Sequence, residues 1–369
     1  MQSLALALAL LASPAAPKVP PAKPGPSLAA PRPRVEVAFV LDTTGSMGGL
    51  IDGAKRRIWS IARRIGEGQP RPDLAIALVG YRDRGDEYVT RVHDLTADMD
   101  LVYQGLMSFQ AGGGGDGPEH VSAALQDAVS RVSWSKSPAL RMIFLVGDAP
   151  PHLDYQDGYD YRRATREAAT RGISIEAIQC GEDATTASFW REIAAAGGGH
   201  YARIDAQGGM PVRVTPMDAE LAKLNAELAS TVVAGGSAAE QAAAGRRLEA
   251  RAAMPAPMAA EAAGYFAKEE RLAEKDLVGL AAAEQKRELQ VLSARPADAP
   301  AVLEGKSEAE AFSYLQRQKA RRDRIQSRIV ELQKQRDAFL GQGGAPRDAF
   351  DEQVLASLRA GAARLGIRY

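Results

Sequence analysis

Apolar runs and amphipathic stretches alternate between residues 34 and 205, and this alternation constrains the fold of the 369-residue chain more than any other feature. Most of the apolar runs show no polar alternation, as expected for strands buried on both faces, whereas the run at 88–95 alternates as an edge strand does. The expected strands are 35–41, 74–79, 88–95, 141–146, 173–179 and 200–204, and the expected helices are 50–65, 119–132, 161–170 and 186–195. The pattern predicts an α/β fold with a doubly wound, mostly parallel sheet and helices on both faces.

Strand patterns end near residue 215, and residues 215–369 are rich in Ala, Glu, Gln, Lys, Arg and Leu. Two capping boxes mark helix starts in this part of the chain: Ser237 with Glu240, and Ser307 with Glu310. Apolar residues recur three and four positions apart over 306–340, which predicts a coiled coil through which two chains could self-associate. Polar residues such as Arg322 interrupt this pattern. The alternative is a helical hairpin packed on itself, so a helical C-terminal region is expected either way.

The N-terminus has the pattern of an export signal followed by a linker. Residues 1–16 contain an unbroken run of nine Leu and Ala residues and then Ser13-Pro14-Ala15, a small-residue cleavage pattern. A membrane span needs about 20 apolar residues, so this run is too short to be one. Residues 17–33 contain seven prolines and favour extended backbone. We expect a signal peptide at 1–16, a Pro-rich linker at 17–33 and an exported protein, periplasmic or extracellular; the alternative is a disordered Ala/Leu tail.

The composition excludes several classes of function. The chain has 46 Lys and Arg against 46 Asp and Glu, so its net charge gives no general attraction to nucleic acid, and no nucleic-acid partner is expected. Cys180 is the single cysteine, which excludes an intrachain disulfide and a cysteine zinc cluster.

Oxygen-bearing side chains follow two expected strands at their carboxyl ends, where open α/β sheets bind ligands. Asp42, Thr44 and Ser46 follow the first strand at alternating positions, so in an extended turn they project to the same side. Asp148 follows the strand at 141–146. A glycine-rich loop at 112–119 precedes a helix, and its glycines let the backbone approach a ligand closely. Carboxylates and hydroxyls are the ligands of a hard divalent cation such as Mg2+, Ca2+ or Mn2+.

These motifs resemble the metal-ion-dependent adhesion site of von Willebrand factor type A domains, and bacterial members in particular. The first motif of that site, Asp-x-Ser/Thr-x-Ser, is matched by Asp42, Thr44 and Ser46, and its late Asp is matched by Asp148. Its second-loop position, usually Thr, falls on Asp116. The resemblance covers about half of the chain. It implies one divalent cation at these five residues and a protein ligand whose acidic side chain completes the cation's shell.

Two other classes of function stay open at this point. Asp42 and Asp148 also resemble the motifs of a haloacid-dehalogenase-type phosphotransferase, in which Asp42 would be the nucleophile and Asp148 a Mg2+ ligand. That chemistry generally needs a second carboxylate two residues after the nucleophile, but position 44 is Thr. It also needs a lysine that contacts the phosphoryl group. Lys136 precedes the strand that Asp148 follows, so it would have to reach the site from the opposite edge. The third class is a scaffold without metal that acts through its helices. We expect a metal-dependent protein-binding module that is not an enzyme and has no catalytic residues.

Weaker signals favour structural interpretations. The Arg-Gly-Asp tripeptide at 84–86 is interpreted as a chance occurrence, and the basic stretch at 317–328 as a solvated helix face. His120 and His152 lack partners at zinc-ligand spacing, so a surface or indirect role is expected for both. Cys180 ends an apolar strand and is expected to pack as a small hydrophobic residue.

Overall fold

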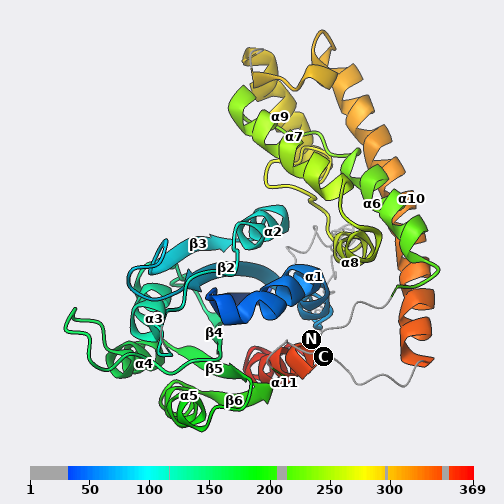
Figure 1. The fold of residues 1–369 in the computed structure, drawn as a ribbon. Coiled ribbons are helices and arrows are strands. Elements are labelled where there is room, and N and C mark those ends of the chain that lie inside the picture. Colours follow the sequence, from blue (N-terminus) through cyan, green and yellow to red (C-terminus); the bar gives the residue numbers. More distant parts are fainter. Residues whose placement is uncertain (1–31, 116, 206–213, 296–297, 343–348) are drawn as a thin grey trace, which may run out of the picture. The chain divides into compact units, whose positions relative to one another are not determined.

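The computed structural model describes residues 32–115, 117–205, 214–295, 298–342 and 349–369 (Figure 1). The predicted signal peptide at 1–16, nearly all of the predicted linker at 17–33 and Asp116 lie outside these ranges. Residues 32–369 belong to one compact unit. Within the described ranges, no helix combines the length and the apolar character needed to cross a membrane.

The sheet has six strands in the order β3-β2-β1-β4-β5-β6. The strands are β1 (Arg34–Asp42), β2 (Asp73–Tyr81), β3 (Thr90–Thr96), β4 (Ala139–Gly147), β5 (Ile173–Cys180) and β6 (Gly198–Ile204). All neighbouring pairs are parallel except β2 and β3, and β3 is the antiparallel edge strand. Every strand expected from the sequence is present, including the edge strand.

Helices cover both faces of the sheet, as predicted (Figure 1). They are α1 (Gly48–Ile65), α2 (Met99–Met107), α3 (Val121–Ser130), α4 (Tyr161–Thr170) and α5 (Ala184–Ala196). Along β1, Val37 and Phe39 pack in the core cluster of α1 and α2, whereas Ala38 and Val40 pack in that of α3, α4 and α5. This alternation is the period of two of a strand, and it leaves β1 apolar on both faces. The sequence analysis did not predict α2, which is only nine residues long.

The rest of the described chain is helical, as expected. The elements are α6 (Asp218–Ala229), α7 (Ala238–Ala252), α8 (Ala256–Phe266), α9 (Ala282–Ala294), α10 (Glu308–Gln342) and α11 (Ala349–Ala362), with 3-10 turns at Ala301–Leu303 and Ala363–Leu365. Both predicted capping boxes form. The Ser237 hydroxyl accepts from the Glu240 N–H and the Glu240 carboxylate accepts from the Ser237 N–H, and Ser307 and Glu310 do the same.

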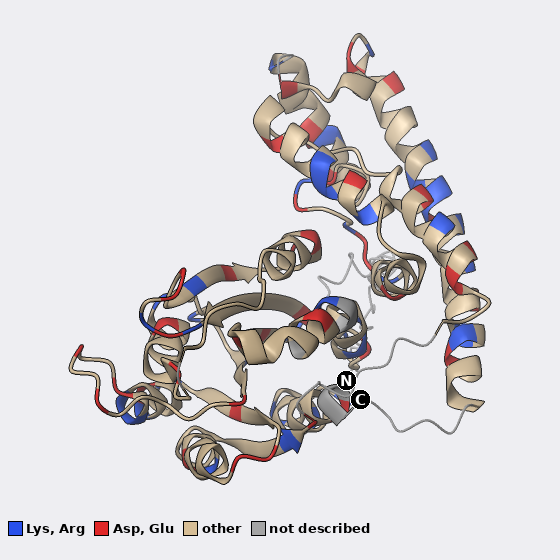
Figure 2. Ribbon diagram, in the orientation of Figure 1, with Lys and Arg blue, Asp and Glu red and all other residues tan. Residues whose placement is uncertain are grey.

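The apolar stripe of α10 packs inside the chain. Ala311 and Leu315 join a cluster with residues of α9, whereas Ile325 and Ile329 join the large core that contains residues of α6 and α8. In the described structure these residues of the stripe are thus covered by the same chain, and the coiled coil at 306–340 stays a prediction. The basic residues of the stretch at 317–328 lie on the more exposed side of α10 (Figure 2), except Arg322, which is buried.

The helical region shares a core with the sheet domain. Trp59 of α1 contacts Tyr265 and Phe266 of α8, with ring centroids 6.0 and 5.3 Å apart. Arg63 of α1 forms ion pairs with Glu261 of α8 and Asp337 of α10. A domain cut near residue 205 would therefore expose part of α1, so experiments belong on the full chain.

Candidate metal site at the sheet edge

Asp42 is the last residue of β1, and its side chain is fully buried. Its Oδ1 accepts hydrogen bonds from the Thr44 N–H at 2.9 Å and the Thr44 hydroxyl at 2.6 Å. Its Oδ2 is buried without a hydrogen-bond partner among the described atoms. Burial raises the pKa of Asp42 to about 7 and the nearby Asp148 charge adds to the rise, while the Thr44 hydrogen bonds oppose it. A buried carboxylate oxygen without a donor is a place where a cation would be stabilised.

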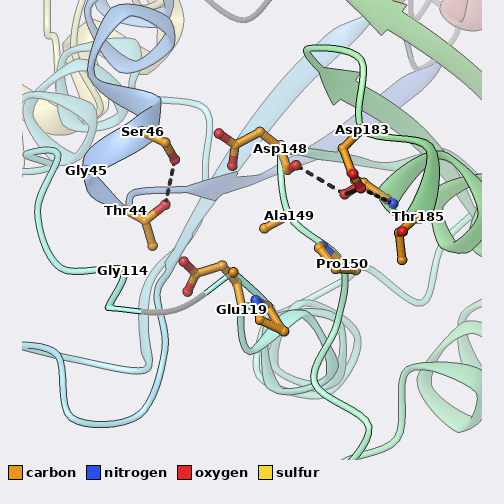
Figure 3. Close-up of a pocket in the computed structure, with 13 residues that line it drawn as sticks. Thr44, Gly45, Ser46, Gly114, Glu119, Asp148, Ala149, Pro150, Asp183 and Thr185 are labelled. Atoms are coloured by element: carbon orange, nitrogen blue, oxygen red, sulfur yellow. Dashed lines mark hydrogen bonds between the residues drawn. The ribbon is translucent and has the colours of Figure 1, made fainter.

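Thr44 and Ser46 supply hydroxyls next to Asp42. Their Oγ1 and Oγ atoms lie 3.3 Å apart, and Figure 3 shows both side chains at the same wall of a pocket. Thr44 precedes the 3-10 turn Gly45–Met47 but forms no side-chain cap on it. The hydroxyl of Thr44 therefore serves Asp42 and the pocket, and it does not serve as a helix cap.

Asp148 reaches the same place because β1 and β4 are adjacent parallel strands whose carboxyl ends meet, with Leu41 opposite Val146. Gly147, the last residue of β4, makes this close approach sterically allowed. A Cβ on Gly147 would collide with the Tyr81 hydroxyl and would lie 3.1 Å from the Asp42 Cβ. The site lies at the carboxyl ends of β1 and β4, where the strand order reverses: β2 and β3 follow on one side of β1, and β4, β5 and β6 on the other. Open α/β sheets bind ligands at such a switch point.

The pocket at this edge has a volume of about 470 Å3. One end is lined by Thr44, Ser46, Glu119 and Asp148, and the other by Asp183 and the first residues of α5 (Figure 3). Asp183 caps α5 by accepting from the Thr186 N–H, and this bond holds its pKa below the usual range. Among the described lining residues there is no Lys, Arg or His, so the pocket is strongly acidic.

The structure thus places four of the five predicted ligands together. Thr44, Ser46 and Asp148 line the pocket, and Asp42 lies beside Thr44 at the end of β1. Asp116 is outside the described residues, so its position is not tested.

Glu119 is a pocket residue that the sequence analysis did not select. It is 3% exposed, and its Oε2 has no hydrogen-bond partner among the described atoms. Burial, and to a smaller extent the charges of Asp42 and other nearby carboxylates, raise its pKa to about 9. The available signal was its place at the end of the glycine-rich loop, which was expected to approach a ligand.

The donor set fits a hard divalent cation. Over the described ranges, no three His, Cys, Asp or Glu side chains form a metal cluster by themselves, so hydroxyls and waters would have to complete the shell. Two carboxylates here have a buried oxygen without a partner among the described atoms, Asp42 Oδ2 and Glu119 Oε2. Asp42 accepts from the Thr44 hydroxyl through its other oxygen, and Glu119 lines the pocket. Carboxylate and hydroxyl oxygens with waters are what Mg2+, Ca2+ and Mn2+ take.

The loop after β2 forms hydrogen bonds to both loops of the site. Arg82 is 5% exposed and donates to the backbone oxygens of Thr43 and Gln110, which ties the first motif to the start of the glycine-rich loop. Asp86 accepts from the Gly114 N–H, and Arg84 pairs with Asp157. Both charged residues of the Arg-Gly-Asp tripeptide are therefore engaged inside the domain, consistent with a chance occurrence.

The two histidines have structural partners. His120 is 2% exposed, so the expected surface position is wrong for it: its Nδ1 accepts from the Ala123 N–H, and its Nε2 lies 2.8 Å from Asp157. His152 stacks on Tyr155 and lies 2.9 Å from Asp154. Cys180 is buried as expected, and burial raises the pKa of its thiol.

The phosphotransferase alternative lacks its basic group. Lys136 precedes β4 and Asp148 follows it, so the two are separated by a nine-residue strand, roughly 30 Å at about 3.3 Å per residue. A lysine side chain cannot bridge that distance, and the described pocket lining contains no other cation.

The fold and the site define a class of protein: an open α/β domain with an acidic, hydroxyl-bearing crevice at the switch point of its sheet. Residues 36–205 match the family model of the von Willebrand factor A domain. Residues 36–205 are therefore a von Willebrand factor A domain, as the sequence motifs predicted.

Relatives and solved structures are similar to part of the chain. The rat von Willebrand factor A domain-containing protein 7 is 39% identical over 122 residues, which is 32% of this chain and 12% of that protein. This chain thus spans only a small part of the curated relatives it matches. An aerotolerance-related membrane protein from Bacteroides fragilis is 19% identical, with 48% of this chain and 96% of that chain covered and a TM-score of 0.34. The mussel proximal thread matrix protein 1, solved with a zinc-occupied MIDAS motif, is 15% identical, with 47% and 42% covered and a TM-score of 0.38.

Proposed function

We propose that this protein is a metal-dependent, adhesion-type protein-binding module. It holds one divalent cation, Mg2+, Ca2+ or Mn2+, through Asp42, Thr44, Ser46, Asp116 and Asp148. The observation that carries the proposal is the buried Asp42 Oδ2, which has no hydrogen-bond partner among the described atoms. The Thr44 hydroxyl bonds to the other oxygen of Asp42, and Thr44, Ser46 and Asp148 line the adjoining pocket. A cation would compensate the cost of burying that oxygen.

The bound cation would act as a binding group. A site with hydroxyls among its ligands leaves part of the positive charge of the cation available, and an oxygen of a protein partner can complete the shell. An acidic side chain of the partner is the group that the resemblance implies. No described Lys, Arg or His lines the pocket, so its described walls hold no cationic side chain to bind a phosphoryl group. We therefore propose binding without chemistry, on an exported protein.

Calorimetric titration of the full chain with Mg2+, Ca2+ and Mn2+ tests the proposal. The wild type should bind at least one of them, and Asp42→Asn should weaken binding by about 100-fold or more, because it removes the charge beneath the site. Asp73→Asn is the matched control, since Asp73 begins β2 at the opposite end of the sheet and its side chain is 60% exposed.

Two outcomes would contradict the proposal. If the wild type binds none of the three cations, the site is not a metal site. If the protein hydrolyses p-nitrophenyl phosphate and Asp42→Asn abolishes the turnover, the phosphotransferase alternative replaces it.

A further inference from the structure

Glu119 stands between the glycine-rich loop and α3, and its carboxylate points into the pocket beside Thr44 and Asp148 (Figure 3). Three carboxylates are among the described residues that line this pocket, and they differ in burial. Asp183 is exposed, Asp148 is half-buried and Glu119 is 3% exposed. The least solvated of the three is also the one with an oxygen, Oε2, that has no hydrogen-bond partner among the described atoms.

The backbone fixes Glu119 in this position. Its N–H donates to the Pro150 oxygen at 2.9 Å, and its own carbonyl oxygen accepts from the His152 N–H at 3.1 Å. These two bonds attach Glu119 to the loop that follows β4, and that loop also carries Asp148. The fold therefore places the Glu119 carboxylate and Asp148 at the same pocket.

Gly114 lies close to both Glu119 and Thr44. A Cβ on Gly114 would lie 3.2 Å from Glu119 Oε1 and 3.1 Å from the Thr44 Cβ. The φ of Gly114 is +79°, which a residue with a side chain rarely adopts. The glycine-rich loop can thus pass over the carboxylate and the threonine only because it has no side chain there, which keeps the two groups facing one small space.

An uncompensated carboxylate in such a position is costly, because burial removes its hydration and the described pocket lining supplies no basic group. A metal cation next to Thr44 and Asp148 would compensate Glu119 as well. We propose that Glu119 is a further anionic member of the cation site and acts on the bound cation directly or through one water. This inference rests on the proposed function.

The extra charge changes what the loaded site can bind. Asp42, Glu119 and Asp148 together carry one more negative charge than a divalent cation neutralises. The cation is therefore held more tightly, while an acidic group of a partner meets less positive potential than in a site without Glu119. Glu119 makes the protein a better cation binder and a weaker, more reversible binder of acidic ligands.

Titration of the full chain with Mn2+ tests this inference in three variants. Glu119→Gln keeps the shape and removes the charge, and it should weaken Mn2+ binding by about tenfold or more. Glu119→Asp keeps the charge on a shorter side chain and should lose less affinity. Glu182→Gln, the matched control, makes the same change on a side chain that is 84% exposed, and it should stay within about twofold of the wild type.

Thermal unfolding in EDTA separates a role at the cation from a structural role. Without metal, Glu119→Gln keeps the shape of a buried side chain whose Oε2 has no hydrogen-bond partner among the described atoms, so its Tm should stay close to that of the wild type. A lower Tm in EDTA together with unchanged Mn2+ affinity would overturn the inference, and so would unchanged affinity alone. If the proposed function holds, Asp42→Asn would lose cation binding in either case. A wild type that binds no cation would instead contradict the proposed function itself.

Discussion

Thr44 donates its backbone N–H and its hydroxyl to the same oxygen of Asp42, and the other oxygen of that carboxylate has no hydrogen bond within the described structure. The two oxygens of the Asp42 carboxylate thus differ: one is held by hydrogen bonds from Thr44, and the other is buried without a partner among the described atoms. Thr44 does two things at once, because its hydroxyl orients Asp42 and also lies 3.3 Å from the Ser46 hydroxyl at the pocket wall.

Thr44→Val should separate these roles from the fold. Valine has the same shape and keeps the backbone N–H bond to Asp42, so the domain should fold, but the hydroxyl is lost and cation affinity should fall by about tenfold or more. Thr165→Val is the matched control: Thr165 is 1% exposed in α4, and its hydroxyl donates to the Tyr161 oxygen. Titration with Mn2+ checks the result, and equal affinities in both variants would remove Thr44 from the site.

The sheet was predictable because its strands are buried by helices on both faces. A strand such as β4, whose last six residues are all buried, has to be a continuous apolar run, and the sequence shows that run directly. The five-residue motif at Asp42 was predictable for the same reason, since its position follows from where β1 ends. The short helix α2 was not found, because nine residues give little periodic signal.

The surroundings of the Glu119 and Arg322 side chains could not be predicted from the sequence. Glu119 lies in a loop, so no period of strand or helix indicates the direction of its side chain. Arg322 seemed to interrupt the apolar stripe of α10, but it is 1% exposed and pairs with Asp276, which is 46 residues away in the sequence. A buried ion pair between distant residues depends on tertiary packing, which local patterns do not contain.

The Arg322–Asp276 pair should be a major stabilising contact of the helical region. Its two hydrogen bonds are 2.6 and 3.1 Å long, and Arg322 also donates to Thr231. Arg322→Met leaves a buried carboxylate without its partner, so the free energy of unfolding should fall by about 3–5 kcal/mol. Urea unfolding followed by circular dichroism measures the change, and cation affinity should stay the same because the pair lies outside the pocket.

Two variants control that measurement. Lys319→Met on the same helix breaks an exposed pair with Asp323 and should change stability by less than about 0.5 kcal/mol. The double variant of Arg322→Met with Asp276→Asn should lose less than the sum of the two single changes, because it leaves no unpaired charge. If the losses are simply additive, the two residues do not act as a pair.

Glu240 gives a pH dependence far from the metal site. A hydrogen bond from Lys275 and the capping bonds with Ser237 lower the pKa of Glu240 to about 2. A carboxyl whose folded pKa is depressed contributes stability that is fully present above its unfolded pKa and is lost as the pH falls through the folded value. The contribution should thus disappear between about pH 4.5 and pH 2. NMR titration should find a higher pKa for Glu240 in Lys275→Met, and an unchanged value would rule out Lys275 as the main cause.

The last prediction concerns Asp116, the residue at which the sequence departs from the family motif. A third aspartate near the cation should raise cation affinity, because opposite charges attract more strongly in a partly desolvated site than in water. The same charge should repel the carboxylate of a ligand. Asp116→Thr should therefore weaken Mn2+ binding, whereas acetate should bind better to the Mn2+-loaded variant, as measured by the fall in water-proton relaxation when acetate displaces metal-bound water.

Asp116→Asn separates charge from shape in that experiment. If electrostatics decide, Asn should behave like Thr although it retains the size of the aspartate. Both variants have to be compared with the wild type at saturating Mn2+, so that lost occupancy is not taken for a change in acetate affinity. Mn2+ affinity equal to that of the wild type in both variants would place Asp116 away from the cation, and the ligand set would then consist of Asp42, Thr44, Ser46 and Asp148, with Glu119 as the remaining candidate for the second loop.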